Sequence, residues 1–226
     1  NKKSYLMSLA NKLKDEVIHH NNYIGGRYSV LSEVGMLPAE LMGFKPEKFR
    51  RLNQLLKSKK FINSLIQGAS SILTLNNKKI TNSIILNYDD RSNDLFNWYQ
   101  QLVAESLGKK NKGILPVIST MTKDNHSLMQ YYLDGVKNNF FTFFFVKEKN
   151  SKKINNTTIL PSQYYLKNKN LSQITIAQKR STEKVFKKKN IPFRSFNLNK
   201  RNEKSLGELF TFFILETILL GKLLDV

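Results

Sequence analysis

Cysteine is absent from this 226-residue sequence, and proline and glycine are scarce, at five and ten residues. Without cysteine the chain can form neither a disulfide framework nor a thiolate metal site, which excludes the disulfide-rich secreted class. No apolar run reaches the roughly twenty residues that a membrane span needs. The longest candidate, at 209–224, is interrupted by Glu216 and Lys222 and indicates a buried amphipathic helix. We therefore expect a cytoplasmic protein with no membrane partner.

Acidic residues are also few, with 17 Asp and Glu against 37 Lys and Arg, so the formal net charge is +20. Such a charge is typical of a surface that binds nucleic acid or an anionic membrane. The lysines are scattered, however, and the sequence has neither zinc-finger spacing nor an RNA-recognition aromatic pattern. An anionic metabolite would explain a basic pocket equally well. We therefore expect no nucleic-acid partner, and keep a non-catalytic basic module as an alternative.

Short apolar segments of strand length alternate with segments of helical periodicity along most of the chain. Strands are expected at 83–88, 113–120, 140–146 and 191–198, and helices at 4–20, 93–107, 126–134, 171–188 and from Glu203 onward. The segment 140–146 is apolar on both faces, as in a parallel sheet that is covered on each side. The alternation predicts a three-layer α/β/α sandwich with a mainly parallel, flavodoxin-like sheet. Residues 147–156 are expected to form a polar loop inside this single domain.

In an open parallel sheet, ligands bind at the carboxyl ends of the strands. That rule selects three places for candidate site residues. The first is the turn that contains Gly25, Gly26 and Arg27, the second is the helix that carries Glu105, and the third is the loop that carries His126.

Glu105 follows the apolar stripe of its helix, formed by Leu95, Trp98 and Leu102 at steps of three and four. A carboxylate half-embedded in that stripe should have a raised pKa. Gln101 lies four residues earlier and therefore points the same way. An amide and a partly desolvated carboxylate directed at one point form a plausible substrate-handling pair; an ordinary surface glutamate on an amphipathic helix is the alternative.

His126 stands at the start of a helix, just after Asp124, which is a natural N-cap. It is either a first-turn residue or a titratable group that meets substrate. His19 and His20 are expected at a helix end, where they favour the helix dipole, and are interpreted as structural. Residues 67–71, "QGASS", lack P-loop spacing and more plausibly tighten a helix turn than bind phosphate.

Four stretches in this order resemble one family. They are "NYIGGRYSVLSEVGMLP", "WYQQLVAESLGKKNKGILPV", "KDNHSLMQYYLDG" and "LGELFTFFILETILLGKLLDV". Together they resemble the second sugar isomerase (SIS) domain of the phosphoglucose isomerase family, from about Asn21 to the last residue. One departure is Glu33, where the family usually has proline or a small residue.

The resemblance implies roles for five residues. Glu105 would be the base that moves a proton between two carbons of the open-chain sugar. His126 would open the sugar ring, reaching the active site of the neighbouring subunit. Gln101 and Gly26 would contact substrate, and Arg27 would stabilise the negative charge of the enediolate.

The resemblance also implies partners and missing parts. A phosphorylated hexose would be the substrate, the protein would be a homodimer with a shared active site, and neither cofactor nor metal is expected. The chain, 1–226, would be the C-terminal part of a longer enzyme with two SIS domains, without the first domain and the final segment with its catalytic lysine. We expect this chain alone to be weakly active or inactive. A different SIS-domain protein that binds sugar phosphates is the alternative.

Overall fold

The computed structural model of the chain describes residues 4–148 and 151–226. Its centre is a four-stranded, all-parallel sheet in the order β2-β1-β3-β4. The strands are β1 (Asn82–Asn87), β2 (Leu115–Thr120), β3 (Asn139–Val146) and β4 (Phe193–Leu198). The open parallel sheet is therefore confirmed. Pro116 lies in β2, an edge strand, where a missing backbone N–H is tolerated.

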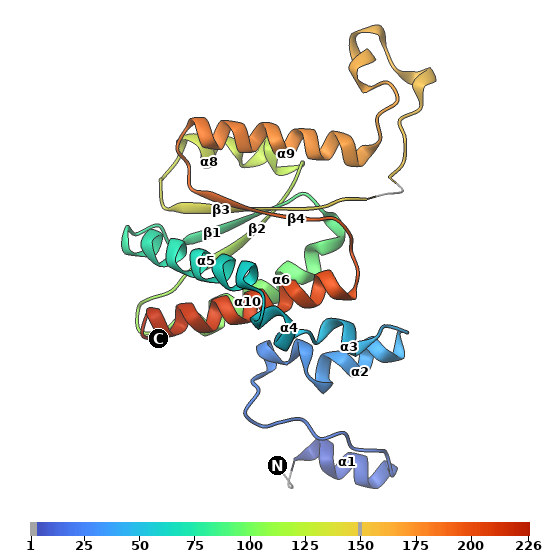
Figure 1. Cartoon of the computed structure of the whole chain (residues 1–226), viewed down its shortest axis with the longest axis vertical. Helices are drawn as coiled ribbons and strands as arrows, with labels where there is room; N and C mark the ends of the chain where they lie inside the picture. Colours follow the sequence, from blue (N-terminus) through green and yellow to red (C-terminus); the bar gives the residue numbers. More distant parts are fainter. Residues whose placement is uncertain (1–3, 149–150) are drawn as a thin grey trace.

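Helices cover both faces of the sheet (Figure 1). One face carries α5 (Lys59–Asn77), α6 (Asn93–Leu107) and α10 (Glu203–Leu223), and the other carries α8 (Met129–Asp134) and α9 (Leu171–Lys188). The side chains of successive residues of β3 point to opposite faces of the sheet, as strand geometry requires. Phe144 packs edge-on against Phe96 of α6, and Phe143 packs edge-on against Phe186 of α9. Because each fully buried Phe contributes about 1.5–3 kcal/mol, β3 supplies much of both cores. The predicted three-layer sandwich is confirmed.

A small lobe of short helices precedes the sheet. It consists of the 3-10 turn η1 (Gly26–Leu31), α2 (Glu33–Leu41), α3 (Pro46–Phe49) and α4 (Leu52–Leu56). The lobe docks on α10 at Gly207, where a Cβ would lie only 2.2 Å from the carbonyl oxygen of Phe49. This docking holds η1 against the sandwich, which positions Arg27.

The first helix is shorter than predicted. Helix α1 spans Tyr5–Leu13 and ends at Lys14, which adopts a left-handed conformation with φ of 56°. None of its residues is buried, and it lies apart from the sandwich (Figure 1). Apolar spacing alone does not extend a helix that has no packing partner. The prediction of a helix to His20 is therefore wrong, and His19 and His20 lie outside any helix.

Most other boundaries agree with the sequence. Helix α9 has the predicted limits, α6 ends before Gly108, and residues 67–71 form a turn within α5. The predicted helix at 126–134 is divided into α7 (Asp124–Ser127) and α8. None of the helices in the described ranges is long and apolar enough to cross a bilayer.

A long excursion joins β3 to α9 and projects from the sandwich (upper right in Figure 1). It includes the short 3-10 turns η3 (Asn156–Thr158) and η4 (Pro161–Leu166), and a bridge between Lys153 and Asn170 closes its base. The predicted polar loop at 147–156 falls in this excursion; residues 149 and 150 lie outside the described part.

Candidate functional site

Helix α6 runs from the carboxyl edge of the sheet to its amino edge. At its start, the Asn87 amide at the end of β1 donates to Asn93 at 2.8 Å. Further along, Gln100 donates to the carbonyl of Pro116, near the beginning of β2, at 3.0 Å. Glu105, in the last turn, therefore lies toward the amino edge. The expectation that this residue lies at the carboxyl ends of the strands is wrong, because α6 returns antiparallel to the strand it follows.

Three of the predicted site residues come together. The guanidinium Nη1 of Arg27 donates to Glu105 Oε1 at 2.9 Å, and the Gln101 amide donates to Glu105 Oε2 at 3.3 Å. The prediction that Gln101 and Glu105 point the same way is confirmed by this contact. Both carboxylate oxygens of Glu105 are thus engaged, one by a residue 78 positions away in the sequence.

The surroundings of Glu105 differ from the prediction. Its side chain is 53% exposed, whereas Leu102 in the preceding turn is fully buried. Glu105 lies at the solvent-exposed edge of the apolar stripe. Leu102 of that stripe packs into the core of the sandwich, and Trp98 contacts η1. The predicted place at the edge of the stripe therefore agrees with the structure, but the carboxylate itself contacts Arg27 and Gln101 and not the apolar side chains.

Arg27 is held at several points by α6. The indole N–H of Trp98 donates to the Arg27 carbonyl at 2.9 Å, and Arg27 Nε donates to Ser106 Oγ at 2.7 Å. The guanidinium also lies 5.0 Å from the ring centre of Tyr28, within cation–π range. Only 20% of the Arg27 side chain is exposed. These contacts keep the cation close to the Glu105 carboxylate.

The second glycine of the pair before Arg27 leaves open space. Neither Gly25 nor Gly26 has a left-handed φ, and among the described residues no heavy atom lies within 4 Å of the position that a Cβ on Gly26 would occupy. The Gly26 carbonyl accepts a hydrogen bond from Ser29, which fixes the first turn of η1. Packing among the residues that the structure describes therefore does not require glycine at position 26, which is exposed.

His20 contacts residues on both sides of the turn that contains Arg27. Its Nε2 lies 3.0 Å from the carbonyl oxygen of Ile24, and its Nδ1 lies 3.3 Å from Ser32 Oγ and 3.6 Å from Glu33. A hydrogen bond of the Glu33 carboxylate to its own backbone, together with His20 and Arg50, lowers the pKa of Glu33. The structural interpretation of His20 thus has a physical basis, although the predicted place at a helix end is wrong.

His126 does not join this group. It is exposed on α7, which follows β2 at the carboxyl edge of the sheet. Asp124 is not the predicted N-cap: it is the first helical residue, and its carboxylate accepts the backbone N–H of Thr120 at 2.8 Å and the Ser119 hydroxyl at 3.0 Å. Asp124 therefore ties α7 to the end of β2 and fixes where His126 stands.

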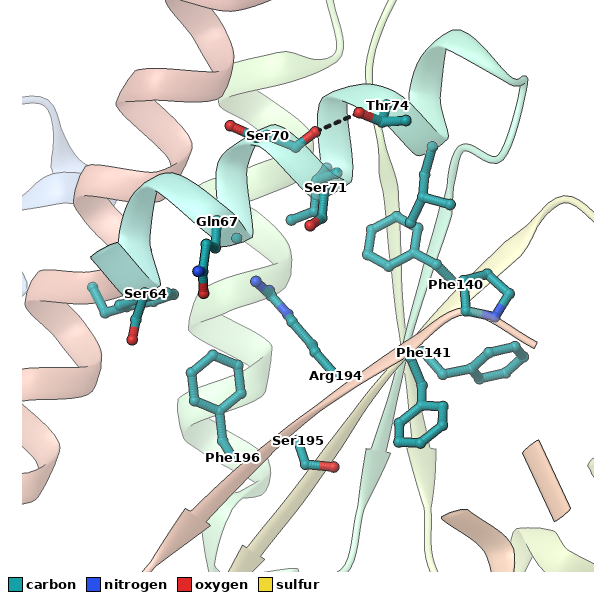
Figure 2. A pocket seen from close by; sticks show the side chains of 16 residues that line it. Ser64, Gln67, Ser70, Ser71, Thr74, Phe140, Phe141, Arg194, Ser195 and Phe196 are labelled. Carbon is teal, nitrogen blue, oxygen red and sulfur yellow. Dashed lines mark hydrogen bonds between the residues drawn. The ribbon is translucent and has the colours of Figure 1, made fainter. Parts of the chain in front are cut away.

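A pocket of about 830 Å³ lies elsewhere, between α5 and the edge strand β4 (Figure 2). Arg194 points from β4 toward α5 (Figure 2). Its Nη2 donates to Glu216 of α10 at 3.0 Å, and its Nε donates to Thr142 of β3 at 3.1 Å. Burial opposes the charge of Arg194, but the Glu216 carboxylate raises its pKa. Since this cation is already neutralised by a buried carboxylate, the pocket offers no free charge for an anionic substrate.

Sequence reasoning missed Ser106 and the site role of Tyr28. Each is the chain neighbour of a predicted residue, Glu105 or Arg27, but only the docking of η1 on α6 brings their hydroxyls within 2.7 Å of one another. The periodicity of residues along one segment does not predict a contact between two distant segments.

Comparisons with known proteins agree on one family. A family model described as phosphoglucose isomerase matches residues 13–224. A probable glucose-6-phosphate isomerase of Methanococcus maripaludis is 32% identical over 93% of this chain and 49% of its own length. The glucose-6-phosphate isomerase of Mycoplasmopsis pulmonis is 34% identical over 90% of this chain and 49% of its own length. The chain thus spans about half the length of these curated relatives.

Solved structures share the fold. The crystal structure of a hypothetical protein from Thermus thermophilus superposes with a TM-score of 0.88 at 22% identity, covering 100% of this chain and 56% of that one. A glucose-6-phosphate isomerase from Chlamydia trachomatis gives a TM-score of 0.60 at 18% identity, covering 93% of this chain and 45% of that one.

Proposed function

The chain belongs to the phosphoglucose isomerase family, and from this premise we propose that the complete protein interconverts glucose 6-phosphate and fructose 6-phosphate through an enediol. We place this reaction in the cytoplasm, as a step of glycolysis and gluconeogenesis. The chain would supply the base and the charge-stabilising arginine, as a single SIS domain of a longer enzyme. The observation that carries the proposal is the contact between Arg27 and Glu105, at 2.9 Å.

The proposed chemistry uses each member of this group. Glu105 would take the proton from carbon 2 of the open-chain aldose and return it to carbon 1. The hydroxyl proton on the oxygen of carbon 2 would pass to the oxygen of carbon 1, so that the carbonyl moves from carbon 1 to carbon 2. In the enediolate between these steps, negative charge on the sugar oxygen would lie beside the Arg27 guanidinium, which offsets it. Gln101, bonded to the other carboxylate oxygen, would hold the base in place and contact the sugar. Gly26 would let the sugar approach the backbone.

His126 would act in the site of a second copy. Within one chain it stands at the opposite edge of the sheet from Glu105, so a site that uses both residues needs two chains. A closed two-fold dimer supplies two equivalent sites of this kind. We therefore propose a homodimer in which each active site takes Glu105 and Arg27 from one subunit and His126 from its partner.

An isomerase assay of the complete gene product tests the proposal. Fructose 6-phosphate formation from glucose 6-phosphate is measured for the complete protein and for residues 1–226 alone. We expect turnover by the complete protein and little or none by the 226-residue chain. A complete protein that binds a linear sugar-alcohol phosphate but turns over no hexose phosphate would favour a non-catalytic SIS protein instead. Binding to nucleic acid that weakens steeply with salt, with no response to sugar phosphate, would favour the basic module.

A further inference from the structure

Two consecutive residues of α6 hold the guanidinium of Arg27 from different sides. Glu105 accepts from Nη1 and Ser106 accepts from Nε, at 2.9 and 2.7 Å. Consecutive helical residues are about 100° apart around the axis, so the exposed carboxylate and the buried hydroxyl approach different N–H groups of the planar guanidinium. Two such contacts fix the orientation of that plane, which a single ion pair does not do.

Ser106 is itself held in place. It is only 8% exposed, and its Oγ lies 2.7 Å from the Tyr28 hydroxyl. Since Arg27 can only donate, Ser106 accepts from Nε. The Ser106 and Tyr28 hydroxyls share a second hydrogen bond, in which either can be the donor. The ring of Tyr28 in turn lies against the guanidinium at 5.0 Å. Arg27, Ser106 and Tyr28 thus form a closed set of contacts.

The arrangement leaves part of Arg27 available. Its Nε and Nη1 are engaged, whereas within residues 4–148 and 151–226 no acceptor is hydrogen-bonded to Nη2. A fixed guanidinium with one free amino group, next to the proposed base, can hold an oxyanion without first reorganising.

We propose that Ser106, braced by Tyr28, is a positioning residue of the proposed isomerisation: it sets the guanidinium plane of Arg27 for the enediolate. This inference rests on the proposed function and adds to it the device that orients the charge-stabilising group. The hydroxyl acts through Arg27 and does not itself touch the reacting atoms.

The test is a double-mutant cycle in the complete protein. Ser106→Ala, Arg27→Lys and the double variant are compared for kcat and KM. We expect Ser106→Ala to lower kcat about tenfold to a hundredfold, the range for losing a hydrogen bond to a charged group, and to change KM less than threefold. In the Arg27→Lys background, which has no Nε–H fork for the hydroxyl to hold, removing the Ser106 hydroxyl should cost less than about twofold. A merely structural serine would cost the same in both backgrounds.

Two further variants guard against misfolding. Ser92→Ala is the matched control. Ser92 is also buried and also hydrogen-bonds a charged group, Asp89, but it lies at the start of α6, at the opposite end of that helix from Ser106. The kcat of this variant should stay within about twofold of wild type. If Ser106→Ala does not fold, Tyr28→Phe replaces it, with an expected loss in kcat of about threefold to tenfold from the freed serine.

Each outcome decides one question. Coupling between Ser106 and Arg27 in kcat supports the inference. An active wild type in which Ser106→Ala or Tyr28→Phe stays within twofold of wild-type kcat, or in which Ser106→Ala costs as much in the Arg27→Lys background, overturns this inference alone. A complete wild-type protein without isomerase activity overturns the proposed function, and this inference with it.

Discussion

Glu105 and His126 lie at opposite edges of one sheet. Glu105 is in the last turn of α6, toward the amino edge, and His126 follows the carboxyl end of β2. The six-residue strands between these edges span about 20 Å. A hexose is much shorter than that span. If both residues take part in one reaction, they must come from different chains.

This separation predicts complementation between inactive variants. Homodimers of Glu105→Gln and of His126→Ala should each be inactive, because every site lacks one group. When the two variants exchange subunits at random, half of the dimers are hybrids and one of the two sites in each hybrid is intact. Activity should therefore return to about a quarter of the wild-type value. The measurement is turnover of glucose 6-phosphate before and after exchange, with hybrid formation followed independently. Confirmed exchange without recovery would exclude the shared site.

The docking of the small lobe on α10 predicts opposite effects at two glycines of that helix. A Cβ at position 207 would meet the Phe49 backbone at 2.2 Å, whereas a Cβ at position 221 would make an ordinary 3.6 Å contact with Leu107. Gly207→Ala should destabilise the fold by about 1–3 kcal/mol. Gly221→Ala should be neutral or stabilise it by up to about 1 kcal/mol, since alanine favours helix. Denaturant unfolding of both variants checks this; equal changes would mean that the lobe does not pack as described.

Three tyrosines predict a loss of stability at alkaline pH. Burial raises the pKa of Tyr88, Tyr99 and Tyr132. Below pH about 10 these phenols are neutral in both the folded and the unfolded state, so their contribution to the free energy of unfolding is fully present. As the pH rises above 10 toward the folded pKa values, the unfolded chain ionises first, so the free energy of unfolding falls.

Denaturant midpoints measured from about pH 8 to pH 11, together with phenolate absorbance, test the alkaline prediction. For the fully buried Tyr99 the slope can reach about 1.4 kcal/mol per pH unit, and Tyr99→Phe should flatten the decline. An unchanged slope in that variant, or ionisation of all the tyrosines together near pH 10 in the folded protein, would show that Tyr99 is not buried as described.

The helices and strands that pack against another layer could be predicted from the sequence. The apolar runs of the four strands and the periodicity of α6, α9 and α10 predicted their elements because each is buried against another layer. The periodicity at the start of the chain extended the predicted helix seven residues beyond Leu13, where α1 ends, because none of the residues of α1 is buried against another element. Helix α5 went unassigned, although Phe61, Leu65 and Ile72 carried a helical signal.

The candidate site was predictable only where it is local. Gln101 and Glu105 lie four residues apart on one helix, and their contact follows from that spacing. The ion pair of Arg27 with Glu105, and the support from Ser106, join segments almost eighty residues apart. They depend on how η1 docks against α6, which the spacing of residues along the chain does not specify.

The most direct test of the proposed isomerase function replaces the proposed base. In the complete protein, Glu105→Gln keeps the shape and hydrogen-bonding reach of the side chain and removes its ability to accept a proton. We predict that kcat for glucose 6-phosphate falls by about 10² to 10⁴, while the Kd of a linear sugar-alcohol phosphate changes less than about threefold. Glu40→Gln, at an exposed glutamate on α2, is the control and should retain activity. A fall in kcat of less than about tenfold for Glu105→Gln would contradict its role as the base.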